Sequence, residues 1–291
     1  MLYSMTGYGR AEIAIAGKFF LIEIKSLNGK QFDLRMITPP LLKQYEIQIR
    51  NLINQYLERG SVECFISIKN NGNSKPVSIN TDLLKSYYHS AKQVADEVDA
   101  DSSALLAAIL RLPDVVAQTI ESLTEDEWTK ISKAFEAALV DLENHRKDEG
   151  LALENELLNR LTIIEGLQQK IEEIEPSRRI KVKENLEKLL ADAVGKENID
   201  ENRLEQELIY YLEKNDITEE QVRLKNHCKY FREILAEKDK SKGKKLGFVL
   251  QEFGREINTT GSKASDAQMQ RVVVLMKDEL EKMKEQVLNI L

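Results

Sequence analysis

Residues 124–175 constrain the fold of this chain more than any other segment. They contain no proline and only two glycines, Gly150 and Gly166. Apolar side chains recur there at the spacing of one helix face: Ile131, Phe135, Leu139, Leu142, Leu157, Leu161, Ile164 and Ile171. The pattern predicts one very long helix or a pair of helices, ended by Pro176. Charged residues between the apolar positions make the segment similar to a coiled coil.

The regions before and after this segment differ in their expected structure. Strands are predicted from alternating apolar residues at 3–15, 19–27, 32–38 and 62–68, with a helix at 41–57. Further helices are expected at 81–98, 102–112, 177–195, 201–214, 218–240, 244–257 and 265–290. We therefore expect an α+β fold: an N-terminal antiparallel sheet with a packed helix, then a long helix and a helical C-terminal region. The expected domains are 1–78, 79–200 and 201–291, the last carrying the site.

Composition excludes several classes of protein. With 42% hydrophobic and 31% charged residues, the chain can bury a core and is not expected to be disordered. No apolar run approaches the roughly 18 residues of a membrane span, and the first residues do not resemble a secretory signal. Cys64 and Cys228 form no CxxC pair, which excludes a cysteine-rich zinc site and is typical of a reducing cytosol. Nucleotide-binding loops and the common hydrolase motifs are absent from the sequence.

Charge is unevenly distributed along the chain. The net charge is −7, yet residues 221–263 are basic and follow an acidic region at 101–220. A basic region of this kind indicates either a polyanion site or a solvated helix face. The predicted flexible linker at 239–247 carries Lys240, Lys242, Lys244 and Lys245, which either bind backbone phosphates or belong to an ordinary loop.

Two late helices carry the residues best suited to chemistry. A capping box at Thr218 predicts a helix on which Glu220, Arg223 and His227 share one stripe. On the next predicted helix, the carboxylates of Glu252 and Glu256 are four residues apart. Such groups hold Mg²⁺ or Mn²⁺, contact phosphate or move a proton; the alternative is salt bridging on a helix surface.

A polar stretch follows these carboxylates. Residues 258–263 are predicted to form a turn whose backbone N–H groups and Lys263 receive an anion, or else a loop that caps the helix. At the other end of the chain, the first strand places Tyr8 and Arg10 on one face, and Asn28 and Lys30 follow the second strand. These residues form either a solvated sheet face or a surface for single-stranded nucleic acid.

Six motifs, in order along nearly the whole chain, resemble the signatures of the YicC/YloC family: SMTGYGR (4–10), KSLNGKQFD (25–33), RGSVEC (59–64), NRLEQEL (202–208), DITEEQVRLKNH (216–227) and QEFGREINTTGSKA (251–264). The resemblance implies a bacterial cytoplasmic, stress-linked, metal-dependent endoribonuclease. It also implies a homo-oligomer, expected to be a hexamer, that encloses RNA. Because some members act as adaptors in small-RNA decay, an exoribonuclease is an implied partner.

Some positions depart from the family pattern. Lys25 and Lys30 stand where arginine is expected, which keeps the charge but loses the bidentate fork. Gly247 stands where the pattern has aspartate, and Gly254 where it has asparagine. If that aspartate is a ligand or a base, this chain relies on neighbouring residues.

The first hypothesis for function is therefore a metal-assisted endoribonuclease that uses Mg²⁺ or Mn²⁺. The expected catalytic residues are His227, Glu220, Glu252, Glu256 and Arg255, with Glu220, Glu252 and Glu256 as metal ligands. The expected RNA-binding residues are Arg10, Asn28, Lys30, Arg59, Arg223, Lys242, Lys244, Lys245 and Lys263. The alternatives are a non-catalytic RNA-binding adaptor that recruits a nuclease, and a structural oligomer paired through the long helix.

Overall fold

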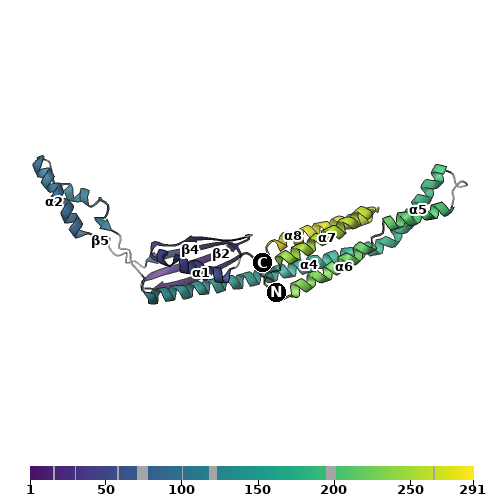
Figure 1. Ribbon diagram of the computed structural model, residues 1–291, viewed down its shortest axis with the longest axis horizontal. Helices are drawn as coiled ribbons and strands as arrows, with labels where there is room; N and C mark the ends of the chain where they lie inside the picture. The colour runs from purple at the N-terminus through teal and green to yellow at the C-terminus, as the bar shows by residue number, and fades with distance from the viewer. Residues whose placement is uncertain are drawn as a thin grey trace.

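A single long helix organises the whole molecule. The computed structural model describes residues 1–15, 17–29, 31–57, 59–70, 78–99, 101–117, 123–194, 201–264 and 266–291. Helix α4 (Glu125–Val194) is 70 residues long, or about 105 Å at 1.5 Å per residue. A sheet lies beside its first half, and three further helices lie beside its second half (Figure 1). The expected α+β fold with a long helix and a helical C-terminal region is confirmed.

The N-terminal sheet has four strands in the order β1-β2-β4-β3. The strands are β1 (Gly7–Ile15), β2 (Lys18–Leu27), β3 (Phe32–Ile37) and β4 (Gly60–Asn70). The β1–β2 and β2–β4 pairs are antiparallel, as predicted. The edge strand β3 pairs with β4 in parallel, because a 3₁₀ helix (Pro40–Tyr45) and α1 (Glu46–Tyr56) carry the chain back between them.

One face of this sheet packs on α1 and the first half of α4. Its core includes Phe20, Ile22 and Ile24 from β2, Ile53 from α1 and Phe135 from α4, all almost completely buried. Gly9 allows β1 to lie directly on α4, since a Cβ at this position would be 2.0 Å from the carbonyl oxygen of Ala138. The sheet and α4 are therefore held together as one layered unit.

Helix α4 does not end at Pro176, and that prediction is wrong. The helix continues through the proline to Val194. Proline removes one backbone hydrogen bond, but neighbouring side chains anchor the helix at this point. The Arg178 side chain is buried and donates to Glu175 at 2.7 Å and to the carbonyl oxygen of Asn215 at 2.8 Å. Contacts with a distant part of the chain, which local sequence does not reveal, thus support the continuous helix.

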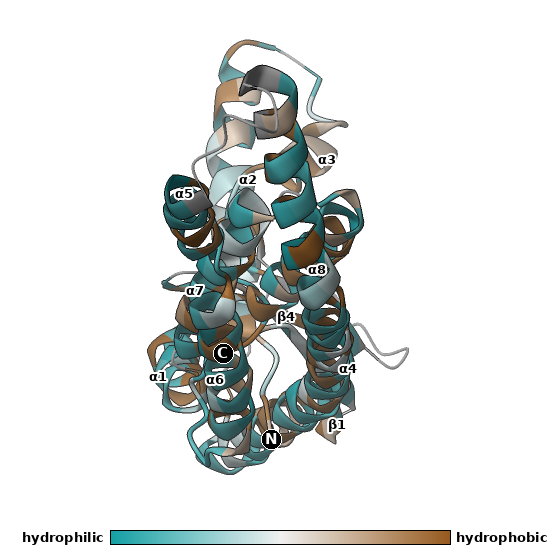
Figure 2. Ribbon diagram, turned by 90° about the vertical axis from the view of Figure 1, so that its right-hand side faces the viewer, coloured by the Kyte–Doolittle hydropathy of each residue, from teal (hydrophilic) through white to brown (hydrophobic). Residues whose placement is uncertain are grey.

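The second core lies beside the C-terminal half of α4. Helices α6 (Thr218–Ala236), α7 (Gly243–Lys263) and α8 (Ala267–Val287) pack there, with α5 (Glu201–Lys214) beside the end of α4 (Figure 1). Phe231, Phe253 and Met276 are among its fully buried side chains. In Figure 2, α4 and α6 carry both hydrophilic and hydrophobic residues around their turns, as amphipathic helices do.

A smaller helical element stands apart from both cores. It consists of β5 (Ser78–Ile79), α2 (Thr81–Glu97), α3 (Leu105–Ile109) and β6 (Val116–Ala117). It projects from the end of the molecule that carries the sheet (Figure 1). Its first helix begins at the predicted Thr81, although the cap is the Asn80 side chain, which accepts from the N–H of Leu83 at 3.1 Å.

The two halves are joined by the last residues of the chain. Met5 N–H donates to the carbonyl oxygen of Asn289 at 2.8 Å, and Leu291 N–H donates to that of Tyr3 at 3.0 Å. The N–H groups of Lys242 and Gly243 both donate to the carbonyl oxygen of Leu291, at 2.7 and 2.8 Å. Segments from the start, the end and the α6–α7 connection therefore meet in one hydrogen-bonded joint.

Candidate functional site

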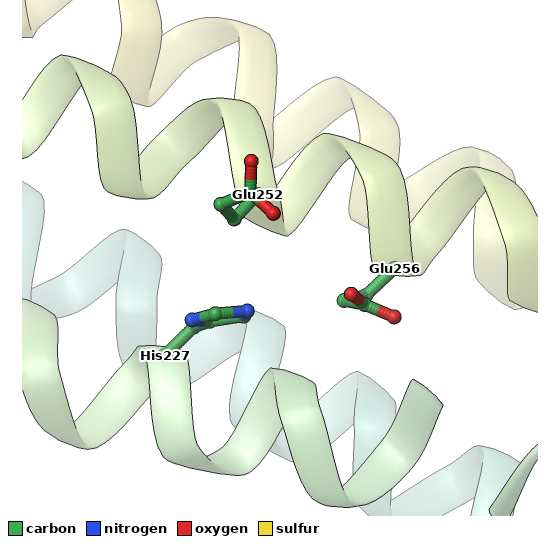
Figure 3. A group of neighbouring side chains, drawn as sticks. All are labelled: His227, Glu252 and Glu256. Atoms are coloured by element: carbon green, nitrogen blue, oxygen red, sulfur yellow. The ribbon is translucent and has the colours of Figure 1, made fainter. Parts of the chain in front are cut away.

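Three of the predicted site residues come together between α6 and α7. His227 from α6 and Glu252 and Glu256 from α7 each offer a ligand atom within 4.8 Å of the others. In Figure 3 the imidazole lies opposite the two carboxylates across the space between the helices. Glu252 and Glu256 share one helix face because they are one turn apart. We refer to these three residues as the histidine–carboxylate cluster.

Apolar packing under the cluster sets the orientation of its side chains. The His227 ring is 6.5 Å from the Phe253 ring, centroid to centroid, and Phe253 is fully buried against Phe231. Glu256 is buried, with 4% of its side chain exposed, whereas Glu252 is 49% exposed. The cluster therefore has one buried and one exposed carboxylate, so a substrate can approach from the Glu252 side.

Two arginines flank the cluster. Arg223 pairs with Glu219 one turn away on α6 and places a guanidinium nitrogen 3.9 Å from Glu256. Arg255 places a guanidinium nitrogen 3.9 Å from Glu252, and 73% of its side chain is exposed. Both cations lie where they can neutralise an anionic ligand of the cluster.

Glu220, the third predicted metal ligand, makes a different interaction. Its Oε1 accepts from the Lys263 ammonium at 2.7 Å, and only 7% of the side chain is exposed. Lys263 also donates to the carbonyl oxygen of Asp216 at 2.9 Å. Among the described residues, the group with metal-ligand geometry contains His227 in place of Glu220. Glu220 and Lys263 instead join the start of α6 to the end of α7.

The predicted anion-binding turn at 258–263 is wrong, because these residues form the last turns of α7. The Thr259 hydroxyl donates to the carbonyl oxygen of Arg255 at 3.0 Å, and the Ser262 hydroxyl donates to the carbonyl oxygen of Thr259 at 2.9 Å. Gly261 lets α8 approach closely, since a Cβ there would be 2.9 Å from a methyl group of Val273. The backbone N–H groups are therefore largely used within the helix.

Asp216, the first residue of the motif at 216–227, was given no role from the sequence and is found to stabilise the start of α6. Its carboxylate accepts from the N–H and hydroxyl of Thr218, at 3.2 and 2.7 Å, and pairs with Arg179 of α4. Burial raises the pKa of this carboxyl, but the bonds from Thr218 and the Arg179 charge outweigh burial and the pKa is lowered. Helix α6 begins at Thr218 as predicted, with Asp216 in place of a capping box. An Asp two residues before a Thr was the available signal.

The linker lysines differ in their availability to RNA. Lys242 is fully buried, and its ammonium donates to the carbonyl oxygen of Leu235 at 2.7 Å, where the end of α6 attracts a cation. It cannot reach a phosphate in this conformation, so its predicted RNA contact is not supported. Lys244 lies over the Phe248 ring, and Lys245 pairs with Glu237 at 2.9 Å. Both are exposed, and the connection itself is confined to residues 237–242.

The predicted RNA-binding residues of the sheet region are distant from the cluster. Arg10 pairs with Glu12, and its backbone N–H donates to Asp141 of α4 at 3.0 Å. The cluster lies beside a later part of α4, bracketed by the ion pairs Lys225–Glu172 and Arg232–Glu165. The separation along α4 is therefore about 40 Å at 1.5 Å per residue. Within one chain the two groups do not meet.

The other predicted RNA contacts near the sheet have structural partners. Asn28 donates to the carbonyl oxygen of Leu288 at 2.7 Å and so belongs to the joint. Arg59 places a guanidinium nitrogen 3.2 Å from the Met5 sulfur. Lys30 lies outside the described residues.

Both cysteine thiols are buried. Burial raises the pKa of Cys64 to about 12, and burial together with the charge of Glu165 raises that of Cys228 to about 12. Neither thiol supplies a thiolate nucleophile near neutral pH.

The histidine–carboxylate cluster fits a divalent cation. Two ligands on opposite sides of an ion lie about 4.2 Å apart, because each bond is about 2.1 Å long. At most one pair of three ligands can lie on opposite sides of one ion, and ligands at right angles are about 3.0 Å apart. The three side chains, whose ligand atoms lie within 4.8 Å of one another, would therefore move inward to hold an ion together. An imidazole nitrogen with two carboxylates suits Mn²⁺ better than Mg²⁺, which prefers oxygen ligands.

Comparison with known proteins assigns the chain to a family. Residues 2–155 match the family model described as "Endoribonuclease YicC-like, N-terminal region", and residues 167–291 match "Endoribonuclease YicC-like, C-terminal". A protein named "Probable endoribonuclease YicC" from Clostridioides difficile (strain 630) is 35% identical over 296 residues. A protein of the same name from Haemophilus influenzae is 30% identical over 295 residues. Both alignments cover 100% of each chain.

Among the described helices, none combines the length and apolar character that a membrane span requires. The cluster and both arginines lie within the part of the chain matched by the C-terminal model. The matches cover almost the whole sequence in two consecutive segments. This chain therefore belongs to the YicC-like endoribonuclease family.

Proposed function

We propose that this protein is an endoribonuclease that cleaves phosphodiester bonds of RNA at the histidine–carboxylate cluster. The family match and the names of the two relatives support RNA cleavage. The observation that carries the assignment of the site is the convergence of His227, Glu252 and Glu256 within 4.8 Å, beside two arginines.

His227, Glu252 and Glu256 would hold a divalent ion, Mn²⁺ or Mg²⁺. When bound, such an ion supplies a Lewis acid next to the phosphate. Its charge also relieves the repulsion between two neighbouring carboxylates, one of which is buried. This would explain why acidic side chains line a site for an anionic substrate.

The remaining chemistry is assigned to side chains of the chain itself. On a route without a bound ion, His227 would transfer a proton at one of its ring nitrogens. On the metal-assisted route its ring would hold the ion, and Glu252, on the exposed side, would orient the attacking group. Arg223 and Arg255 would stabilise the charge that develops on the phosphate oxygens. Attack by water leaves a 5′-phosphate, whereas attack by the 2′-hydroxyl leaves a cyclic phosphate, so the product ends identify the route.

Assembly belongs to the same proposal. The resemblance to the family supports a cytoplasmic homo-oligomer, a hexamer, that encloses RNA. Within one chain, Arg10 is about 40 Å from the cluster along α4. A second copy would bring a sheet next to the cluster and complete the RNA-binding surface.

The double variant His227→Ala/Glu252→Ala tests the proposal. Its cleavage and its binding of a labelled hairpin RNA are measured. We expect kcat/KM to fall at least 100-fold, since general acid–base catalysis contributes about 10²–10⁴-fold. Binding should persist, because the exposed cations remain. The matched control is His145→Ala/Glu281→Ala, which removes the same residue types from exposed positions outside the cluster.

Three outcomes distinguish the alternatives. If the purified double variant cuts as fast as the wild type, the site assignment is wrong. If the wild type binds RNA but does not cut it with Mn²⁺ or Mg²⁺ present, the protein is an RNA-binding adaptor. Unchanged cleavage after complete removal of divalent ions would contradict the metal-assisted route alone.

A further inference from the structure

The face of the N-terminal sheet that points away from α4 and α1 is open to solvent. On this face Phe65 of β4 is 43% exposed and Ile37 of β3 is 50% exposed. The adjacent, inward-pointing residues Cys64 and Ile66 of β4 are almost completely buried. The sheet therefore buries one face in its core and presents large apolar side chains to solvent on the other.

A row of charged side chains crosses this open face. Lys25 of β2 lies directly opposite Glu63 of β4, which lies directly opposite Arg35 of β3. Neighbouring groups are already paired: Tyr8 donates to Glu23 at 2.5 Å, and Arg10 pairs with Glu12. In the described part of the chain, by contrast, Glu63 and Arg35 make no hydrogen bond or ion pair, and Lys25 only lies 5.9 Å from the Tyr8 ring. Three adjacent charged groups are thus available to a ligand.

This row borders a hollow of about 340 Å³, a volume suited to a small planar ring. Its lining side chains include Glu23, Lys25, Arg35, Ile37, Glu63 and Phe65. Two cations and two carboxylates balance each other, so the hollow is not a site for backbone phosphate alone. Charged residues are also depleted from the centres of protein interfaces. An aromatic side chain beside both donors and acceptors fits a nucleobase, which stacks on one face and hydrogen-bonds at its edge.

A carboxylate beside a cation, an arrangement that occurs on either side of Glu63, matches the edge of guanine. Its Watson–Crick edge presents two adjacent N–H donors, which a carboxylate accepts. Its O6 and N7 atoms are acceptors, which lysine or arginine recognises. Adenine offers no pair of adjacent donors to Glu63, and its amino group would face a cation. We propose that this hollow binds a guanine of single-stranded RNA, stacked against Phe65 and read by Glu63, Lys25 and Arg35.

This inference rests on the proposed function, because it takes RNA as the substrate. It separates the site that selects RNA from the site that cuts it, and it adds a base preference to a protein with otherwise general phosphate contacts. The residues involved lie outside the histidine–carboxylate cluster, so binding and cleavage can be measured independently.

Fluorescence anisotropy with two labelled decanucleotides tests the proposal. One is oligoadenylate and the other carries a single central guanine; all proteins carry His227→Ala, so that the RNA stays intact. We expect the parent to bind the guanine-containing RNA about 10-fold more tightly, since a bidentate base contact contributes about 1–3 kcal/mol. Glu63→Gln should abolish this preference. Phe65→Ala should weaken binding of the guanine-containing RNA at least 10-fold.

Phe19→Ala is the matched control. Phe19 lies on the same open face, is 42% exposed and is outside the hollow, so both affinities should stay unchanged. Thermal melting and elution volume are recorded for every variant. Because Phe65 and Glu63 point to solvent, their substitution should leave the fold intact.

The outcomes separate this inference from the proposed function. If the wild type cuts RNA but Phe65→Ala and Glu63→Gln bind the guanine-containing RNA like the parent, the inference is wrong and the proposed function stands. If the wild type neither binds nor cuts any RNA, the proposed function fails first. If Phe65→Ala changes the assembly but not the preference for guanine, this face is a contact between copies, which overturns the inference.

Discussion

At the scale of single residues, the ion pair of Lys263 and Glu220 links the two helices that carry the cluster. Glu220 is almost completely buried and its Oε2 has no partner among the described residues, so Lys263 provides the main compensation for its charge. Removing one partner of a buried pair leaves an uncompensated charge. The positions of α6 and α7 relative to each other therefore depend on this pair.

Lys263→Met should lower the free energy of unfolding by about 2 kcal/mol. This value is below that of a fully buried pair, because 28% of the Lys263 side chain is exposed. Urea unfolding followed by circular dichroism measures the change. Lys245→Met is the control, since its pair with Glu237 is half exposed and screened by solvent, and its loss should lower the free energy of unfolding much less. Equal losses in the two variants would contradict the structural role of Lys263.

The candidate site could be predicted from sequence only as far as helix spacing reaches. Glu252 and Glu256 share a face by periodicity alone, and the hypothesis that His227 meets them depended on two helices packing at that face. The interactions of Glu220 and Lys242 could not be predicted, because Glu220 pairs with a residue distant in sequence and Lys242 is buried by other segments. Lys263 was expected to be free for an anion, and its ammonium is instead used by Glu220 and Asp216.

At the scale of elements, the two glycines of helix α4 have opposite roles. A Cβ at Gly150 would be 2.2 Å from the carbonyl oxygen of Leu2, whereas one at Gly166 would have nothing within 4 Å. Gly150 therefore lets the first residues of the chain cross the helix closely. Gly166 only adds flexibility to an exposed helical position.

Gly150→Ala should destabilise the protein by about 2 kcal/mol or more, because backbone atoms must move apart. Gly166→Ala should stabilise it by about 1 kcal/mol, since alanine favours the helix. Thermal melting of the two variants and the wild type measures both effects. The same sign for both substitutions would show that the crossing at Gly150 does not constrain the structure.

Element boundaries were predictable where the signal was local. Strands β2, β3 and β4 and helix α5 follow their expected ranges closely, because alternation and helical periodicity are visible in a short window. Strand β1 begins at Gly7, four residues later than expected, and the short strands β5 and β6 were not expected. A short sequence window did not predict that α4 continues past Pro176 or that α7 continues through residues 258–263. In both places tertiary contacts, through Arg178 and through the close approach of Val273 to Gly261, stabilise helix where sequence favours a break.

At the scale of the whole molecule, two separate cores share α4. One is formed by the sheet, α1 and the helix up to Leu142, and the other by α6, α7, α8 and the helix from Leu153 onward. The single tryptophan, Trp128, stacks on Tyr45 with ring centroids 4.0 Å apart and packs against the first core. Its fluorescence therefore reports on the N-terminal half alone.

Phe253→Ala should destabilise the second core by about 3–5 kcal/mol. We expect the circular dichroism transition to move to lower urea concentration while the tryptophan transition stays in place. Ile53→Ala, in the first core, should move the tryptophan transition instead, by about 2–5 kcal/mol. If either variant shifts both transitions equally, the halves unfold as one cooperative unit.

The unbroken helix α4 also fixes the distance between the two proposed RNA sites. It places the open sheet face and the helices that carry the histidine–carboxylate cluster about 40 Å apart along its axis. A stacked single strand advances about 3.4 Å per nucleotide, so spanning this interval takes about a dozen nucleotides. A shorter RNA would contact only one of the two proposed sites on a given chain, either the hollow of the sheet or the histidine–carboxylate cluster. The length of α4 would therefore set a minimum length for an RNA that is bound at both sites.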